Sequence, residues 1–442
     1  MRRAGRERHS GWRGAATVAL VAMAGGCAGA QETSPIPPAR PDAKVAAMTA
    51  EAGSAGEAVP MPPVSPAGFE AWRDGFRARA LGEGISAATF DAAFAGVEID
   101  PDIVRLDRHQ PEFTRRIWKY LDSAVSPTRI ANGRGKAAEQ AAALAEIEAE
   151  YGVDRAAVVA IWGLESAYGA VKGSTPVMRG LATLAYDGRR RAFFEIELLA
   201  ALRILEAREI APAGLIGSWA GAMGHTQLLP SNYLRYGVDV TGDGRRDIWG
   251  ADPRDALGST ANYLKSFGWT LGQPAVRRIT LPAGFDYGLA DQSVRRPVAE
   301  WQAMGIRAAD GSALPAAAEV AVLLPAGAAG PAWLAYPNFR VIKRYNNATA
   351  YALGISLLAQ EISGEGMGVA GLDWPRGDRP LTRDEKMLLQ RSLTAQGFDT
   401  QGVDGRIGPN TQKAVRAFQA AAGLTPDGYV TEALLKRVVA GG

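Results

Sequence analysis

The sequence predicts a mainly α-helical protein with a small β-sheet and a separate three-helix module at the C-terminus. Segments spread over residues 69–361 carry apolar side chains at helical spacing. Alternating or β-branched runs between residues 276 and 341 predict a few short strands. Further apolar repeats of helical period follow within residues 381–440. The chain has 442 residues, a length that suits two or three domains.

The predicted elements can be given by residue range. The helices are 69–81, 87–94, 113–125, 137–151, 156–168, 190–207, 231–236, 255–267 and 348–361. The strands are 276–281, 319–324 and 333–336. Helices that greatly outnumber strands make this a mainly α protein in which the sheet forms a small β subdomain.

The first 26 residues have the features of a secretion signal. A basic stretch at residues 2–13 precedes an apolar run at residues 15–24, which is too short to span a hydrocarbon core of about 30 Å. Two processing schemes are open. In one, Ala24-Gly25-Gly26-Cys27 is a lipoprotein box and Cys27 becomes the lipidated first residue. In the other, Ala28-Gly29-Ala30 is a cleavage site before Gln31.

We favour the lipoprotein scheme because it accounts for the position of the single cysteine. Both schemes export the protein, and the favoured one anchors it to a membrane through Cys27, in the periplasm and at the outer membrane. Residues 27–66 are rich in proline and show no apolar period, so we expect an extended tether.

Composition argues against several classes of function. The net charge is +3, but the arginine-rich first 26 residues carry +4, so the remaining chain lies near −1. Nucleic-acid binding therefore lacks its usual basic surface. With one cysteine and three histidines, the chain cannot build a zinc site from the usual ligands, which disfavours zinc amidases and peptidases.

Glu165 is the strongest candidate for chemistry. It lies near the end of a predicted helix capped by Asp154, on a face whose other residues are Val158, Ile161 and Trp162. A carboxyl group there is poorly hydrated and close to the negative end of the helix dipole, so we expect a raised pKa. A general acid needs such a pKa near neutral pH. The alternative is a structural glutamate paired with an arginine of residues 189–191.

Two other segments have the composition of a sugar-binding site. Residues 217–227 combine three glycines, which let the backbone approach a ligand closely, with the side chains of Ser218, Met223 and Gln227. Residues 336–351 combine aromatic rings with amides, including Tyr345, Asn346 and Tyr351. Rings cover apolar sugar faces, and amides bind hydroxyl and acetamido groups. A tight loop and a cluster of core aromatics are the structural alternatives.

Residues 239–247 resemble the start of an EF-hand calcium loop. Glycine stands at loop position 6, the carbonyl of Arg245 falls at position 7, and oxygen-bearing side chains occupy positions 1, 3 and 5, namely Asp239, Thr241 and Asp243. Position 12 departs from the pattern, because Gly250 replaces the usual glutamate, and Asp255 could substitute for it. We expect any Ca²⁺ here to be structural. The alternative is an ordinary turn.

Three motifs together resemble the membrane-bound lytic murein transglycosylase B family. They are Glu165-Ser166-Ala167-Tyr168-Gly169, the stretch 217–227, and Arg344-Tyr345-Asn346, in the order and spacing of that family. The resemblance covers roughly residues 67–370. It implies an α+β lysozyme-like catalytic domain with a deep cleft, which cuts the MurNAc-β-1,4-GlcNAc bond of peptidoglycan without adding water.

The same resemblance implies roles for individual residues. Glu165 would be the single acid and base, the substrate's 2-acetamido group would replace a second carboxylate, and the product would be 1,6-anhydroMurNAc. The cleft would be lined by Ser218, Met223, Gln227, Tyr345, Asn346 and Tyr351. No cofactor would be required, although the loop described above could hold a structural Ca²⁺. The implied partner is the peptidoglycan glycan strand.

Residues 381–442 resemble a peptidoglycan-binding type 1 module, with two similar Asp-Gly loops between the predicted helices. Residues 373–380 would form a hinge between this module and a catalytic domain of residues 67–372. Two rival functions stay open. A hydrolytic muramidase on the same fold would need a second carboxylate, for which only Asp187 and Asp239 could be nominated. A non-catalytic peptidoglycan-binding scaffold would need no acid.

Overall fold

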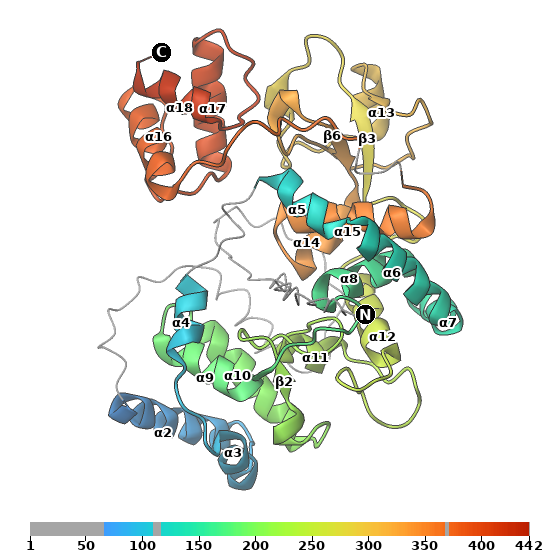
Figure 1. Cartoon of the computed structure of the whole chain (residues 1–442), viewed down its shortest axis with the longest axis vertical. Coiled ribbons are helices and arrows are strands. Elements are labelled where there is room, and N and C mark those ends of the chain that lie inside the picture. Colours follow the sequence, from blue (N-terminus) through green and yellow to red (C-terminus); the bar gives the residue numbers. More distant parts are fainter. Residues whose placement is uncertain (1–65, 109–115, 367–370, 442) are drawn as a thin grey trace, which may run out of the picture.

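The structure is a computed structural model that describes residues 66–108, 116–366 and 371–441. The predicted secretion signal, Cys27 and almost all of the tether lie outside these residues. Figure 1 shows a large helical domain, a small sheet beside it, and the C-terminal helices as a separate group. The helices before the sheet are α2 (Pro66–Gly82), α3 (Ala87–Phe94), α4 (Pro101–Arg108), α5 (Ile117–Ala124), α6 (Pro127–Glu139), α7 (Ala141–Tyr151), α8 (Arg155–Ser166), α9 (Val177–Asp187), α10 (Arg191–Glu206), α11 (Pro230–Tyr236) and α12 (Arg254–Ser266).

Helix α8 forms the centre of the large domain. Every residue from Ala157 to Ser166 is buried, so the helix is covered on all sides and not only along one face. Its neighbours are α6, α7, α12 and α15 (Thr349–Ser363). Asp154 occupies the predicted N-cap position, but the capping bond is absent. Its carboxylate instead accepts hydrogen bonds from the indole of Trp269 and the amide of Gly272.

A second group of helices packs below this centre in Figure 1. Helix α9 lies against α10, and both contact α3, while α4 packs on α9. Aromatic contacts join the first two helices of the group, since the ring of Phe76 in α2 lies against those of Phe90 and Phe94 in α3. A short two-stranded sheet, β1 (Thr175–Pro176) with β2 (Ile216–Gly217), connects α9 to the loop that follows α10.

The small β subdomain lies between α12 and α14 (Pro337–Tyr345). Its strands are all antiparallel, in the order β4-β3-β6-β5, and comprise β3 (Val276–Thr280), β4 (Arg307–Ala308), β5 (Ala321–Leu323) and β6 (Ala332–Ala335). Trp301 of α13 (Val298–Ala303) is fully buried in the separate core of this subdomain. The three predicted strands are confirmed, and β4 is an additional edge strand.

Several helix predictions were wrong or incomplete. The segment predicted as one helix at 137–151 is two, because the backbone breaks at Gln140 between α6 and α7. Helices α4, α9, α13 and α14 were not predicted. The α14 segment is rich in aromatic and β-branched residues, whose helix propensity is low. Pro337 begins this helix, and packing against α15 and β6 stabilises it.

The C-terminal module is built from α16 (Arg383–Ala395), α17 (Pro409–Ala421) and α18 (Glu432–Val439), around its own apolar core. It has two similar halves. In each, a helix glutamine donates to the aspartate of an Asp-Gly turn at 2.9 Å and accepts from the glycine amide at 2.8 Å. The glutamines and turns are Gln390 with Asp404-Gly405, and Gln419 with Asp427-Gly428.

The linker and the module both contact the large domain. Trp374 of the linker is buried and stacks on Trp333 of β6, with ring centroids 5.7 Å apart. Arg116, just before α5, donates to the hydroxyl of Tyr429 at 2.9 Å and pairs with Asp378. Within the described ranges, no helix has the length and apolar character needed to cross a bilayer.

Candidate active site

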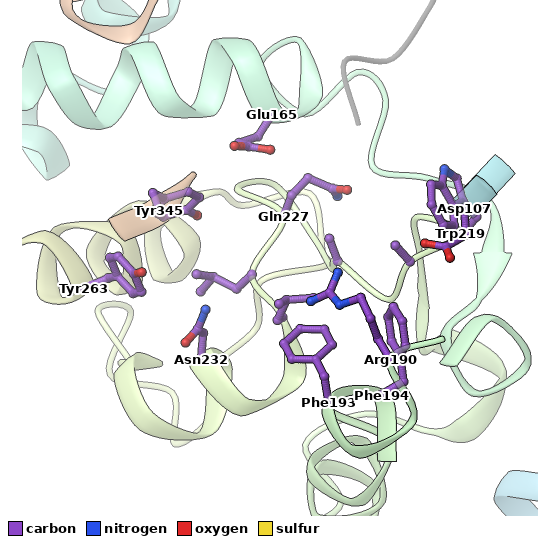
Figure 2. Close-up of a pocket in the computed structure, with 14 residues that line it drawn as sticks. Asp107, Glu165, Arg190, Phe193, Phe194, Trp219, Gln227, Asn232, Tyr263 and Tyr345 are labelled. Carbon is purple, nitrogen blue, oxygen red and sulfur yellow. The ribbon is translucent and has the colours of Figure 1, made fainter. Parts of the chain in front are cut away.

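Glu165 lies at the end of α8 and faces a pocket (Figure 2). Its side chain points toward Gln227 and Tyr345, which come from the loop after β2 and from the end of α14. Glu165 is only 2% exposed, so few water molecules can hydrate its carboxyl group. The sequence explains why this acid is buried, because apolar residues precede it along α8 up to the last turn of the helix.

The environment of Glu165 favours the protonated form. Burial raises the pKa of its carboxyl group to about 8, and the hydroxyl of Tyr351, which donates to Oε1 at 2.5 Å, opposes part of this rise. No ion pair to Glu165 is present among the described residues, and Arg189 pairs with Asp107 instead. The charge of an arginine is also not among the causes of the pKa shift of Glu165, so the structure does not support the alternative of a glutamate paired with an arginine of residues 189–191. A carboxylic acid with this pKa can donate a proton near neutral pH.

The turn after Glu165 is held in an unusual backbone conformation. Ala167 and Tyr168 both have positive φ angles, 50° and 61°, which cost free energy in residues other than glycine. The amide of Gly169 donates to Ser166 Oγ at 2.9 Å, which closes the turn. Strained backbone of this kind is concentrated at functional sites. The turn therefore supports the assignment of Glu165 to a site.

His225 locks this turn to the second motif. Its Nδ1 accepts from the indole of Trp162 at 3.1 Å, and its Nε2 contacts the carbonyl of Gly250 at 2.9 Å. Burial lowers the pKa of His225, which favours the neutral ring that Nδ1 needs in order to accept, while Nε2–H donates to Gly250. A β-carbon at Gly169 would lie 2.5 Å from this ring, so only glycine fits there. The first two motifs thus form one unit.

The loop of residues 217–227 supplies one wall of the pocket. Gln227 lines the pocket, has a positive φ of 54°, and is fixed by bonds from Nε2 to the carbonyls of Gly224 and Lys172. Ser218 accepts from the amide of Ala222 at 3.0 Å and shapes the loop. Met223 is fully buried, and neither it nor Ser218 lines the pocket. Ser218 and Met223 therefore support the loop that lines the pocket and do not themselves face it.

The third motif contributes through Tyr345. Its ring lines the pocket and its hydroxyl donates to the carbonyl of Thr226. Asn346 is buried beside it but does not line the pocket, and its Oδ1 accepts from the amide of Ala348 at 2.9 Å. Of the six side chains nominated for the cleft, two line this pocket and Tyr351 reaches Glu165 directly.

Other residues that line the pocket were not predicted from the sequence. They include Arg190, Phe193, Phe194, Asn232 and Tyr263. The guanidinium of Arg190 lies 4.2 Å from the ring centroid of Phe193. The spacing of residues 190, 193 and 194 is that of one helical face, which was the available signal.

A second free carboxylate is absent from the described pocket lining. Asp107 is the other acid there, and Arg189 engages it. Asp187 forms an ion pair with Arg108 and does not line the pocket. The arrangement therefore offers one proton-donating carboxyl group, an amide and several aromatic rings, which suits the cleavage of a sugar polymer by a single acid.

Only some of the residues proposed to bind calcium lie close together in the structure. Asp239 accepts from the Thr241 hydroxyl and Asp255 from the Thr241 amide, so these three residues lie together. Burial is the main cause that raises the pKa of Asp255, and the charge of Asp239 adds to the rise. Asp243 instead caps the amide of Arg245. The described residues hold no group of three acidic, histidine or cysteine side chains placed to bind a metal. Calcium binding stays a prediction.

A helical fold with Glu165 buried at a pocket, and with a small β subdomain beside it, is the architecture expected of a lysozyme-like lytic transglycosylase. Comparison with known families agrees, since residues 68–360 match the transglycosylase SLT domain and residues 382–438 match the peptidoglycan binding domain. The chain belongs to the transglycosylase SLT domain family. The predicted fold class and family resemblance are thereby confirmed.

Individual relatives support this assignment. The chain is 34% identical over 247 residues to membrane-bound lytic murein transglycosylase B of Escherichia coli strain K12, which covers 55% of this chain and 67% of that protein. The crystal structure of SltB3 from Pseudomonas aeruginosa, in complex with NAG-anhNAM-pentapeptide, matches with a TM-score of 0.81 and 52% identity, over 84% of this chain and 99% of that one. Escherichia coli Slt35 in complex with calcium matches with a TM-score of 0.58 and 30% identity, over 66% and 92%.

Proposed function

We propose that this enzyme cleaves the MurNAc-β-1,4-GlcNAc bond of peptidoglycan and leaves a 1,6-anhydroMurNAc end. One observation carries the proposal: Glu165 is buried at the pocket, has a pKa raised to about 8, and has only the Tyr351 hydroxyl as its partner among the residues that the structure describes. The solved relative with 52% identity was crystallised with a NAG-anhNAM-pentapeptide, which is an anhydro product of this kind.

In this mechanism Glu165 moves one proton twice. It first donates its proton to the oxygen that leaves with GlcNAc, while the bond from that oxygen to C1 of MurNAc breaks. The acetamido oxygen of the same MurNAc bonds to C1 and carries the positive charge. Glu165, now a carboxylate, removes the proton of the C6 hydroxyl. The freed O6 then bonds to C1, displaces the acetamido oxygen and restores Glu165 to its acid form.

The surroundings of Glu165 suit both halves of this cycle. Burial favours the acid form before cleavage, and the Tyr351 hydroxyl stabilises the carboxylate that cleavage produces. A hydrolytic muramidase of the usual kind needs a second carboxylate, and Asp107 is already engaged by Arg189. These features favour the lytic reaction over hydrolysis.

Mass spectrometry of muropeptides released from purified sacculi tests the proposal. A lytic product is one water lighter than the reducing end that hydrolysis leaves. We expect only the lighter product, and we expect Glu165→Gln to abolish it while the protein still sediments with sacculi. Release of reducing ends would identify a muramidase, and no release by the wild-type protein would favour a binding scaffold.

We further propose that the C-terminal module holds the enzyme on peptidoglycan and that Cys27 anchors it to the membrane. The match of residues 382–438 to the peptidoglycan binding domain supports the first part. The membrane-bound Escherichia coli relative supports an envelope location. Metabolic labelling of cells with a fatty-acid analogue tests the anchor. The wild-type protein should carry the label, and the Cys27→Ser variant should not.

A further inference from the structure

A basic groove lies at the junction of the β subdomain, helix α14 and helix α17 of the C-terminal module. We call it the junction groove. Its empty space is about 1890 Å³, including the open mouth. Five cationic side chains line it, namely Arg295, Arg340, Lys343, Arg344 and Lys413. Figure 1 shows the module beside the sheet, so both structural units contribute to the groove.

The positive charge in the junction groove is poorly neutralised. Arg340 is paired with Glu319, but the other four cations have no carboxylate within 4 Å among the residues the structure describes. Among the described residues that line the groove, Asp291 is the one acidic side chain, and its carboxylate is engaged by Ser293 and by Arg416. A chain with a net charge of only +3 therefore gathers a strong local excess of positive charge here.

Part of this charge is held away from water. Lys343 is half-buried, its Nζ donates to the amide oxygen of Gln292 at 3.2 Å, and burial lowers its pKa. Burial also lowers the pKa of Arg340, and the nearby charge of Arg295 lowers it further. Like charges held together in a partly desolvated groove are unfavourable unless an anion binds among them.

The position of the groove indicates which anion. Lys343 and Arg344 precede Tyr345 on α14, and the ring of Tyr345 lines the pocket of Glu165. One short helix thus reaches both sites. The sugar units of a peptidoglycan strand are uncharged once the lactyl group is joined to peptide, so the free carboxylates of the stem peptides are its anionic groups.

We propose that the junction groove binds the carboxylates of peptidoglycan stem peptides, an inference that rests on the function proposed above. Arg295 and Lys413 approach from opposite structural units and are both exposed, so they can reach a peptide without rearrangement. The groove therefore makes affinity depend on stem carboxylates as well as on the glycan. It also gives the C-terminal module a direct part in substrate binding.

The test measures binding of fluorescently labelled, uncrosslinked strands to the full chain by anisotropy. All proteins carry Glu165→Gln, so that no strand is cleaved. Adding Arg295→Gln with Lys413→Gln should raise the dissociation constant about fivefold, as the loss of two solvent-exposed charge contacts implies. Strands whose stem carboxylates have been converted to amides should bind both proteins equally.

The matched control is Lys119→Gln with Arg391→Gln in the same background. These residues are also exposed, lie outside the groove and have no carboxylate within 4 Å in the described chain, so the charge change is identical. Equal weakening by both pairs, equal weakening on amidated strands, or no weakening would each overturn the proposal. Product analysis of the wild-type protein separately decides the proposed function, so the two failures are distinguishable.

Discussion

Replacing Tyr351 by phenylalanine should move the alkaline limit of activity upward. The Tyr351 hydroxyl donates to Glu165 Oε1 at 2.5 Å, and this bond lowers the pKa of Glu165 against the larger effect of burial. Removing the hydroxyl leaves burial unopposed, so the pKa rises from its value of about 8. Glu165 must be protonated to cleave, and activity is therefore lost as the pH rises through this pKa.

The size of the shift follows from the hydrogen bond. A bond to a charged group contributes about 1.5–3 kcal/mol. One pKa unit corresponds to about 1.4 kcal/mol, so the alkaline limb should move up by about one to two units. The assay is kcat/KM for release of anhydro-muropeptides from soluble strands as a function of pH.

Tyr345→Phe is the matched control. The Tyr345 hydroxyl donates to the Thr226 carbonyl and not to Glu165, so its removal should leave the alkaline limb in place whatever it does to the rate. An alkaline limb that stays fixed or moves down in Tyr351→Phe would refute the reasoning. It would mean that this hydroxyl does not stabilise the charged form of Glu165.

The remaining predictions concern activity, stability and metal binding. Glu165→Gln should lower turnover below detection, a loss of at least about 10²–10⁴-fold. The same variant should raise the melting temperature, and by more at pH 8 than at pH 5. The pKa of Glu165 is raised from 4.5 to about 8 in the folded wild-type protein, so the wild type loses stability as the pH rises through that window. Equal shifts of the melting temperature at both pH values would contradict this. Gly133→Ala should cost about 1–3 kcal/mol in urea unfolding, since a β-carbon would lie 2.5 Å from Tyr168 Oη, and an unchanged midpoint would exclude this packing. Asp255→Ala should lower the melting temperature, because three backbone amides lose their acceptor, and should abolish any stabilisation by millimolar Ca²⁺; a calcium response that persists places the ion elsewhere.

Elements with a strong apolar period could be predicted from sequence alone. The face that carries Glu165 identified α8, and the alternating runs identified three of the strands in the larger sheet. Helix α14 was missed because its aromatic and β-branched residues have low helix propensity, and its packing against α15 and β6 cannot be inferred from its own residues. The break between α6 and α7 was missed because both sides continue an apolar pattern.

The sequence by itself was enough to predict that Glu165 is a buried acid, and to identify the three motifs and the family that they indicate. Only the tertiary structure decided what surrounds Glu165. Tyr351, whose hydroxyl binds Glu165, is 186 residues from it along the chain. Arg190, Phe193 and Phe194 of the pocket come from the start of another helix, α10. The spacing of apolar residues predicts which face of a helix or strand is buried, because that spacing depends only on residues within the same element. It does not predict which two elements meet, since that depends on how the whole set of apolar faces packs together.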